Sequence, residues 1–134
     1  MRATEKYRIS ILEKRIIENR LIDSSNIEVE DIKEVLIINN ELSNGEQFAL
    51  LIDTGEYTSS SIEAREFGAT KEYAENIIAQ AIFIHSIPQR IVGNFYIKVN
   101  KPFVETKLFT DRDKAIEWLK DKTERLIKKR THLS

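Results

Sequence analysis

The sequence predicts an α/β fold in which an N-terminal β-hairpin leads into a mostly parallel mixed sheet of about five strands, covered by helices. Three observations support this fold class. The 134 residues are enough to bury about two thirds of the unfolded chain's surface. After the hairpin, strand-like and helix-like segments alternate, which favours parallel pairing. The apolar run at residues 48–52 has no polar interruption, as is typical of a strand covered on both faces.

Composition excludes several classes of site and partner. The chain has no cysteine, which excludes disulfides, thiolate metal ligands and cysteine nucleophiles. Its 21 Lys and Arg residues nearly balance its 22 Asp and Glu residues, so no net field recruits nucleic acid. No apolar run approaches the ~20 residues of a transmembrane helix, and the first residues lack a signal-peptide core. We therefore expect a cytoplasmic protein with one domain over residues 1–134, no transmembrane segment and no nucleic-acid partner.

The first half of the chain is expected to form the hairpin, one helix and the central strand. Segments rich in β-branched residues at 7–12 and 15–22 are separated by only two residues, which predicts an antiparallel hairpin. Apolar residues at helical spacing predict a helix over about 30–43, and Gly45 supplies its left-handed stop. The central strand follows at residues 48–52.

Two short helices are expected after the central strand, over residues 61–67 and 71–78. Ser60 and Glu63 have the spacing of a capping box, which predicts the start of the first helix. Gly68 joins the two helices, and a pair joined in this way is more pliable than one long helix. If any part of the domain opens, we expect it here.

The remaining chain predicts a buried strand over 79–84, a helix over 88–100, a more exposed strand over 104–109 and a last helix from about residue 110. Gly93 lies inside the second of these elements, where it costs about 1 kcal/mol relative to alanine. This cost suggests close packing of the helix against a neighbouring backbone.

The chain resembles the STAS/SpoIIAA-like group, the fold of the bacterial anti-sigma factor antagonists, and in particular its uncharacterised bacterial STAS-like members. Four segments carry this resemblance across nearly the whole chain, namely FALLIDT at 48–54, SIEAREF at 61–67, IVGNF at 91–95, and KLFT with AIEWL within 107–119. The resemblance implies a SpoIIAA-like fold and a non-catalytic regulatory module. The wider fold is also similar to lipid-transfer domains of the CRAL-TRIO type, which implies binding of an apolar ligand.

Four consecutive hydroxyl residues, Thr58, Ser59, Ser60 and Ser61, form the first candidate site. In the antagonists, a serine at the matching helix start is phosphorylated by a partner kinase, and the resemblance extends this expectation to the four residues. The Asp and Gly that flank the antagonist serines are absent here. Helix capping, worth about 1 kcal/mol for one hydroxyl, is the alternative that the residues themselves favour.

The second candidate site is an apolar pocket between the helices at 61–78 and 88–100. Aromatic and aliphatic residues on these segments supply flat apolar surface, and tyrosine adds a hydroxyl for orientation. Core packing is the alternative role for most of them. The residues assigned to this pocket are Tyr57, Phe67, Tyr73, His85, Ile91, Phe95 and Tyr96.

Catalytic, metal and nucleotide signatures are missing from the sequence. No nucleophile-elbow, Walker or dinucleotide-binding motif occurs, so we predict no enzyme activity and no cofactor. An enzyme acting through Asp53, Ser60 and His85 is a third hypothesis with no motif behind it. Two histidines without a paired carboxylate pattern predict no metal site.

The sequence therefore predicts, first, a regulatory interaction module that contacts an unknown protein partner through residues 57–67. The alternative is a protein that binds an apolar small molecule or lipid in the predicted pocket. A homodimer is compatible with either hypothesis.

Overall fold

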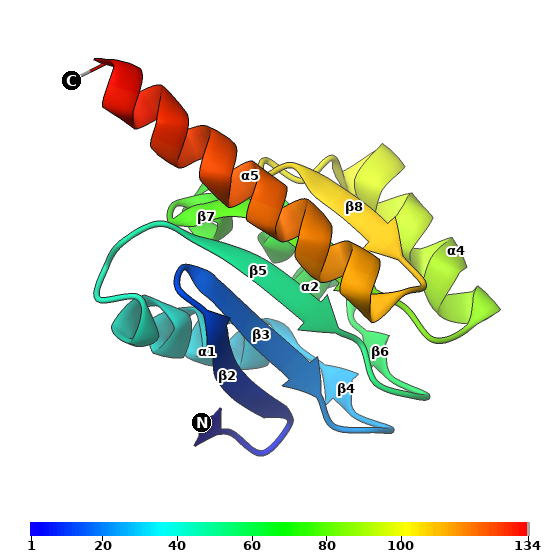
Figure 1. Ribbon diagram of the computed structural model, residues 1–134. Coiled ribbons are helices and arrows are strands. Elements are labelled where there is room, and N and C mark those ends of the chain that lie inside the picture. The colour runs from blue at the N-terminus through cyan, green and yellow to red at the C-terminus, as the bar shows by residue number, and fades with distance from the viewer. Residues whose placement is uncertain (134) are drawn as a thin grey trace.

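The computed structural model describes residues 1–133, with side chains through residue 131. Its main sheet has six strands in the order β1-β2-β3-β5-β7-β8 (Figure 1). Neighbours pair antiparallel from β1 to β3 and parallel from β3 to β8. The predicted fold class, with its N-terminal hairpin and mostly parallel mixed sheet, is thereby confirmed. The strands are β1 (Arg2–Ala3), β2 (Tyr7–Glu13), β3 (Ile16–Leu21), β5 (Phe48–Asp53), β7 (Ile77–Phe83) and β8 (Thr106–Phe109).

Helices cover both faces of this sheet. The long C-terminal helix crosses one face, and the remaining helices lie on the other (Figure 1). These elements are α1 (Val29–Leu42), α2 (Ile62–Gly68), α3 (Lys71–Ala74), α4 (Ile87–Phe95), the π-helical turn η1 (Tyr96–Asn100) and α5 (Arg112–Leu133). No helix within residues 1–133 combines the length and apolar character that a membrane span requires.

The central strand β5 has the double-sided burial that its sequence predicts. Alternate residues point to opposite faces, so Leu50 packs in the cluster under α1 while Ala49 and Leu51 pack under α5. Phe48, Ala49 and Leu51 are fully buried, and Leu50 is 1% exposed. At the carboxyl end of the strand, the carboxyl side chain of Asp53 is buried. The strand therefore places this side chain where β5 ends, beside His85.

Two very short strands that the sequence does not predict form a second, parallel sheet. They are β4 (Asn26–Ile27) and β6 (Ser59–Ser60), paired Asn26 to Ser59 and Ile27 to Ser60. The Ser59 hydroxyl also bonds the Asn26 side chain. The chain between β5 and α2 is thus held as a strand, and α2 begins later than predicted.

The predicted capping box at Ser60 and Glu63 is wrong by one residue. Ser61 is the N-cap of α2, and its hydroxyl accepts a 3.0 Å hydrogen bond from the Ala64 amide. Ser60 belongs to β6 instead. A side-chain oxygen one residue nearer the helix reaches the free amide of its first turn, so Ser61 takes the role expected of Ser60.

Element boundaries also differ around the second half of the sheet. The predicted helix over 71–78 is one turn, α3, and its last residues Ile77 and Ile78 belong to β7. The predicted helix over 88–100 is divided into α4 and η1. Gly93 does pack closely, but against a side chain: a Cβ there would lie 2.8 Å from Cδ2 of Leu108 on β8.

Candidate functional site

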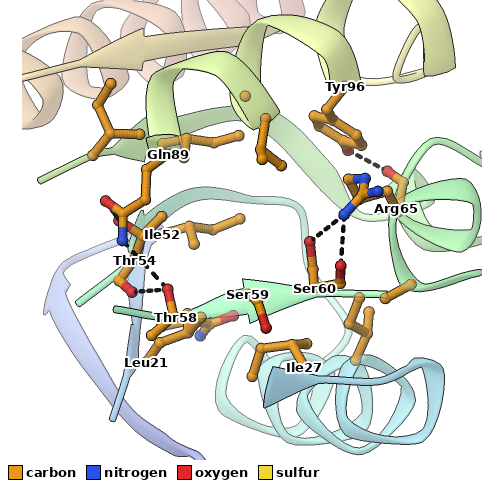
Figure 2. Close-up of a pocket in the computed structure, with 18 of the residues that line it drawn as sticks. Leu21, Ile27, Ile52, Thr54, Thr58, Ser59, Ser60, Arg65, Gln89 and Tyr96 are labelled. Atoms are coloured by element: carbon orange, nitrogen blue, oxygen red, sulfur yellow. Dashed lines mark hydrogen bonds between the residues drawn. The ribbon is translucent and has the colours of Figure 1, made fainter. Parts of the chain in front are cut away.

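A cavity of about 680 Å³ lies between α1, α2, α4 and the sheet. It is placed outside the carboxyl ends of β3 and β5, where open α/β sheets commonly bind ligands. Figure 2 shows α4 and η1 along one side of this space and the β6 strand with Ile27 along the opposite side. Exposed residues at its rim, including Tyr57 and Ser59, show that the cavity opens to solvent.

The walls of the cavity are mainly apolar. Helix α1 contributes one wall, the strands contribute the floor, and α4 contributes the wall opposite. The apolar side chains that line it include Leu21, Ile27, Ile32, Val35, Leu36, Ile52, Ile82, Ile84 and Val92. Such a lining favours the hydrocarbon part of a ligand, because binding removes apolar surface of both the ligand and the cavity wall from contact with water.

Gln89 on α4 fastens the helix to the loop after β5. Its Nε2 donates to the Gly55 carbonyl at 2.9 Å, and its Oε1 accepts from the Thr54 hydroxyl at 3.0 Å. The same Oε1 accepts from the backbone amide of His85 at 2.6 Å. These bonds occupy the carboxamide, so Gln89 positions the cavity wall.

The side chains of Asp53 and His85 are in contact where β5 and β7 end. Nε2 of His85 lies 2.7 Å from Oδ1 of Asp53, which also accepts a hydrogen bond from the Gly55 amide at 3.0 Å. Ser60, the third residue of the enzyme hypothesis, accepts from Arg65 instead. No hydrogen bond among the described residues joins Ser60 to His85, so the side-chain relay of a serine nucleophile is not assembled.

Gln80 is the centre of a buried polar network in the lining of the cavity. The Tyr73 hydroxyl donates to its Oε1 at 2.8 Å, and its Nε2 donates to the hydroxyls of Tyr96 and Thr106, each at 3.0 Å. The Tyr96 hydroxyl in turn donates to the Gly68 carbonyl. Burial raises the pKa of Tyr96 to about 12 and that of Tyr73 well above its ordinary value of 10.0. Both phenols are therefore neutral at physiological pH.

Arg65 extends from α2 toward the cavity (Figure 2). Its Nη1 donates to the Ser60 carbonyl at 2.6 Å and to the Ser60 hydroxyl at 3.0 Å. Both acceptors are neutral. The guanidinium is thus a positive charge at an apolar cavity, held in place by the β6 strand.

Tyr57, Tyr73, His85 and Tyr96, four of the seven residues assigned to a pocket from sequence, line this cavity. The other three do not. Phe67 packs against the core with its ring at a T-shaped angle to Tyr73. Ile91 and Phe95 are 64% and 50% exposed on the outer face of α4.

The four hydroxyl residues are placed differently from one another. Thr58 donates to the Thr54 carbonyl at 2.7 Å, and Ser61 caps α2. Ser59 is exposed, whereas Ser60 is half buried beside Arg65. Thr58, Ser59 and Ser60 all lie on the lining of the cavity.

Sequence reasoning missed Arg65, Gln80 and Gln89. Arg65 and Gln89 are polar residues within amphipathic helices, where a solvent-facing role is the usual one. For Gln80 a signal was present, because it is the one polar residue inside the apolar segment at 79–84. No group of three or more metal-ligating side chains occurs among the described residues.

The architecture defines an α/β protein of the SpoIIAA-like class. An uncharacterised protein of the DUF3478 family from Shewanella loihica PV-4, described as having a SpoIIAA-like fold, superposes with a TM-score of 0.63. The alignment covers 89% of this chain and 98% of that one at 17% sequence identity, a level that establishes the fold alone. The SpoIIAA-like fold that the sequence resemblance implies is confirmed.

The chain itself belongs to DUF7793, a family described as a domain of unknown function, whose model matches residues 10–123. No curated protein matches the chain.

Proposed function

We propose that this protein binds an apolar small molecule, without catalysing a reaction, in the cavity between α1, α2, α4 and the sheet. The observation that carries the proposal is the cavity itself, with a volume of about 680 Å³ and mainly apolar walls. Small-molecule sites are commonly on the order of 300–1,000 Å³ and combine apolar walls with a few polar groups. The cavity matches that description in size and in lining.

A pair of adjacent residues on α4 offers a matched test. Val92 lines the cavity, whereas its neighbour Ile91 is outside the lining and 64% exposed. A tryptophan at position 92 should fill part of the cavity, and a tryptophan at position 91 should extend into solvent. Both changes leave the buried core of the sheet intact.

The experiment measures binding of the neutral apolar dye Nile red by its fluorescence. The wild type and Ile91→Trp are expected to bind the dye with the same affinity, and Val92→Trp at least tenfold more weakly. Displacement of the dye by dodecanol should follow the same order. Equal dye affinity in all three proteins, or no binding to the wild type, would refute the proposed function.

A regulatory interaction through residues 57–67 is the second candidate. It is supported by the exposure of two large apolar side chains in this segment, Tyr57 at 85% and Ile62 at 62%, beside the exposed Ser59. Phosphate on Ser59 would add charge next to this apolar surface and change its affinity for a protein partner. Mass spectrometry of protein from its native cells tests the idea, and a peptide over 57–65 consistently without phosphate would contradict the switch.

A further inference from the structure

We infer that the ligand of this cavity is an amphiphile whose anionic oxygen head group, a carboxylate or a phosphate, binds Arg65. The inference rests on the proposed function and specifies the chemistry of its ligand. It follows from an imbalance in the cavity: one cation there has no acidic partner among the residues whose side chains are described, while the carboxamides that line the cavity are already paired.

Arg65 forms no ion pair within the part of the chain whose side chains are described. Two nearby acidic residues do not pair with Arg65: Asp53 lies outside the lining and contacts His85, and Glu56 is exposed at the rim. The glutamates of α2, Glu63 and Glu66, are exposed and outside the lining. The positive charge therefore has no counter-ion among the side chains of residues 1–131.

Arg65 also keeps donors available. A guanidinium has five N–H groups in a planar fork, and the hydrogen bonds of Arg65 use only Nη1, to the carbonyl and hydroxyl of Ser60. That pair of bonds fixes one side of the fork and leaves Nη2 and Nε for another acceptor. Carboxylates and phosphates match this geometry because they accept two parallel N–H bonds.

The four carboxamide side chains in the lining are already hydrogen-bonded within the protein. Asn19 and Asn39 are buried, and each donates its Nδ2 to the other's Oδ1 at 2.9 Å. Gln89 and Gln80 use both the donor and the acceptor of their amides within the protein. A ligand head group would have to break these bonds to bind at the carboxamides, whereas at Arg65 it gains bonds without breaking any.

The two features together specify the ligand class. The apolar walls formed by α1, β5 and β7 suit a hydrocarbon chain, and the only unneutralised cation in the described lining suits its charged end. The head group of such a ligand would pair with Arg65, and its alkyl chain would be buried against the apolar walls. A neutral apolar molecule would fill the walls and leave the guanidinium without an anion.

The test compares three ligands with the same alkyl chain: dodecanoate, dodecyl phosphate and dodecanol. Isothermal titration calorimetry is run on the wild type, Arg65→Met and Arg65→Gln, with Arg90→Met as the control. Arg90 is exposed on α4 and does not line the cavity. Glutamine at position 65 keeps an N–H donor for the Ser60 carbonyl, so the charge is tested even if the methionine variant fails to fold.

The wild type and Arg90→Met should bind dodecanoate, dodecyl phosphate or both roughly 10- to 100-fold more tightly than dodecanol, the range expected for a charge-assisted hydrogen bond. Both Arg65 variants should lose this preference and retain the dodecanol affinity of the wild type. The anion whose affinity exceeds that of dodecanol by the larger factor shows whether the site prefers a carboxylate or a phosphate head group.

Two results would overturn the inference. If the wild type binds the anions and dodecanol equally, or if the preference survives in the Arg65 variants, the head-group inference fails while the apolar cavity stands. If the wild type binds neither the three ligands nor Nile red, the proposed function fails with it.

Discussion

Replacing Gln80 with methionine should destabilise the fold by breaking the buried tyrosine network. Methionine has a similar length and no branch, so the change tests hydrogen bonding more than packing. The buried Tyr73 hydroxyl loses its only acceptor, a cost of about 1–3 kcal/mol. Tyr96 and Thr106 lose an accepted bond but still donate to backbone carbonyls, at about 0.5–1.5 kcal/mol each. We expect a loss of roughly 2–6 kcal/mol, a large share of the ~5–15 kcal/mol typical of a domain.

A double-mutant cycle separates this network from general damage. In the wild type, Tyr73→Phe strands the Gln80 carbonyl oxygen and should cost about 1–2 kcal/mol. In the Gln80→Met background the same change removes an unpaired hydroxyl and should be neutral or stabilising. Unfolding free energies come from urea titrations followed by far-UV circular dichroism. Tyr57→Phe is the control, because Tyr57 is 85% exposed and should be additive with Gln80→Met. Additivity of Tyr73→Phe and Gln80→Met to within about 0.5 kcal/mol would refute the network.

Three further predictions concern pH, backbone geometry and capping. Burial raises the pKa of Tyr96 to about 12, against 10.0 in the unfolded chain, so its contribution to the free energy of unfolding is intact below pH 10 and is lost between pH 10 and 12. In urea titrations, the free energy of unfolding of Tyr96→Phe should fall by about 2–3 kcal/mol less over that interval than that of the wild type. Equal decreases in the two proteins would contradict the assignment. Gly55→Ala should lower the melting temperature far more than Gly45→Ala: both glycines have positive φ, but a Cβ at Gly55 would lie 2.6 Å from the Leu21 carbonyl oxygen, whereas Gly45 faces open space. Ser61→Ala should cost about 1 kcal/mol of unfolding free energy as the true N-cap of α2, and a larger cost for Ser60→Ala would contradict that assignment.

The parts of the fold that the sequence predicts are those in which one local pattern decides the structure. The uninterrupted apolar run at 48–52 predicts a strand buried on both faces, and the paired segments at 7–12 and 15–22 predict the hairpin. Asn44 and Gly45 follow the cap of α1 with φ values of +54° and +74°, as the left-handed stop predicted at this pair requires. In each case the residues specify the element without help from distant parts of the chain.

The parts that the sequence does not predict depend on contacts between distant segments. The β4–β6 pairing joins residues more than thirty positions apart through two-residue strands that carry no periodicity of their own. That pairing displaces the start of α2, which is why Ser60 was assigned the cap that Ser61 provides. Ile77 and Ile78 continue a helical pattern after α3, but pairing of β7 with β5 places them in the sheet.

In the candidate site too, the residues that the sequence predicts depend on local character and the others depend on contacts between distant segments. Tyrosines that combine an apolar ring with a hydroxyl could be assigned to a pocket from sequence, as Tyr73 and Tyr96 were. Arg65 could not, because the absence of an acidic partner is a property of its surroundings in three dimensions. The outward positions of Ile91 and Phe95 likewise depend on which face of α4 meets the sheet, and Gly93 fixes that face by its contact with Leu108.

Helix α4 is fastened at three points: by Gln89 to the loop after β5, by Gly93 against Leu108, and, through the turn that continues it, by Tyr96 to Gly68. A cavity whose wall is held in this way is preorganised, so little conformational entropy is lost when the ligand binds. Association should then be a single diffusive encounter, its observed rate rising linearly with ligand concentration in stopped-flow mixing. An observed rate that levels off at high ligand concentration would instead indicate a conformational step that limits binding, which these three contacts argue against.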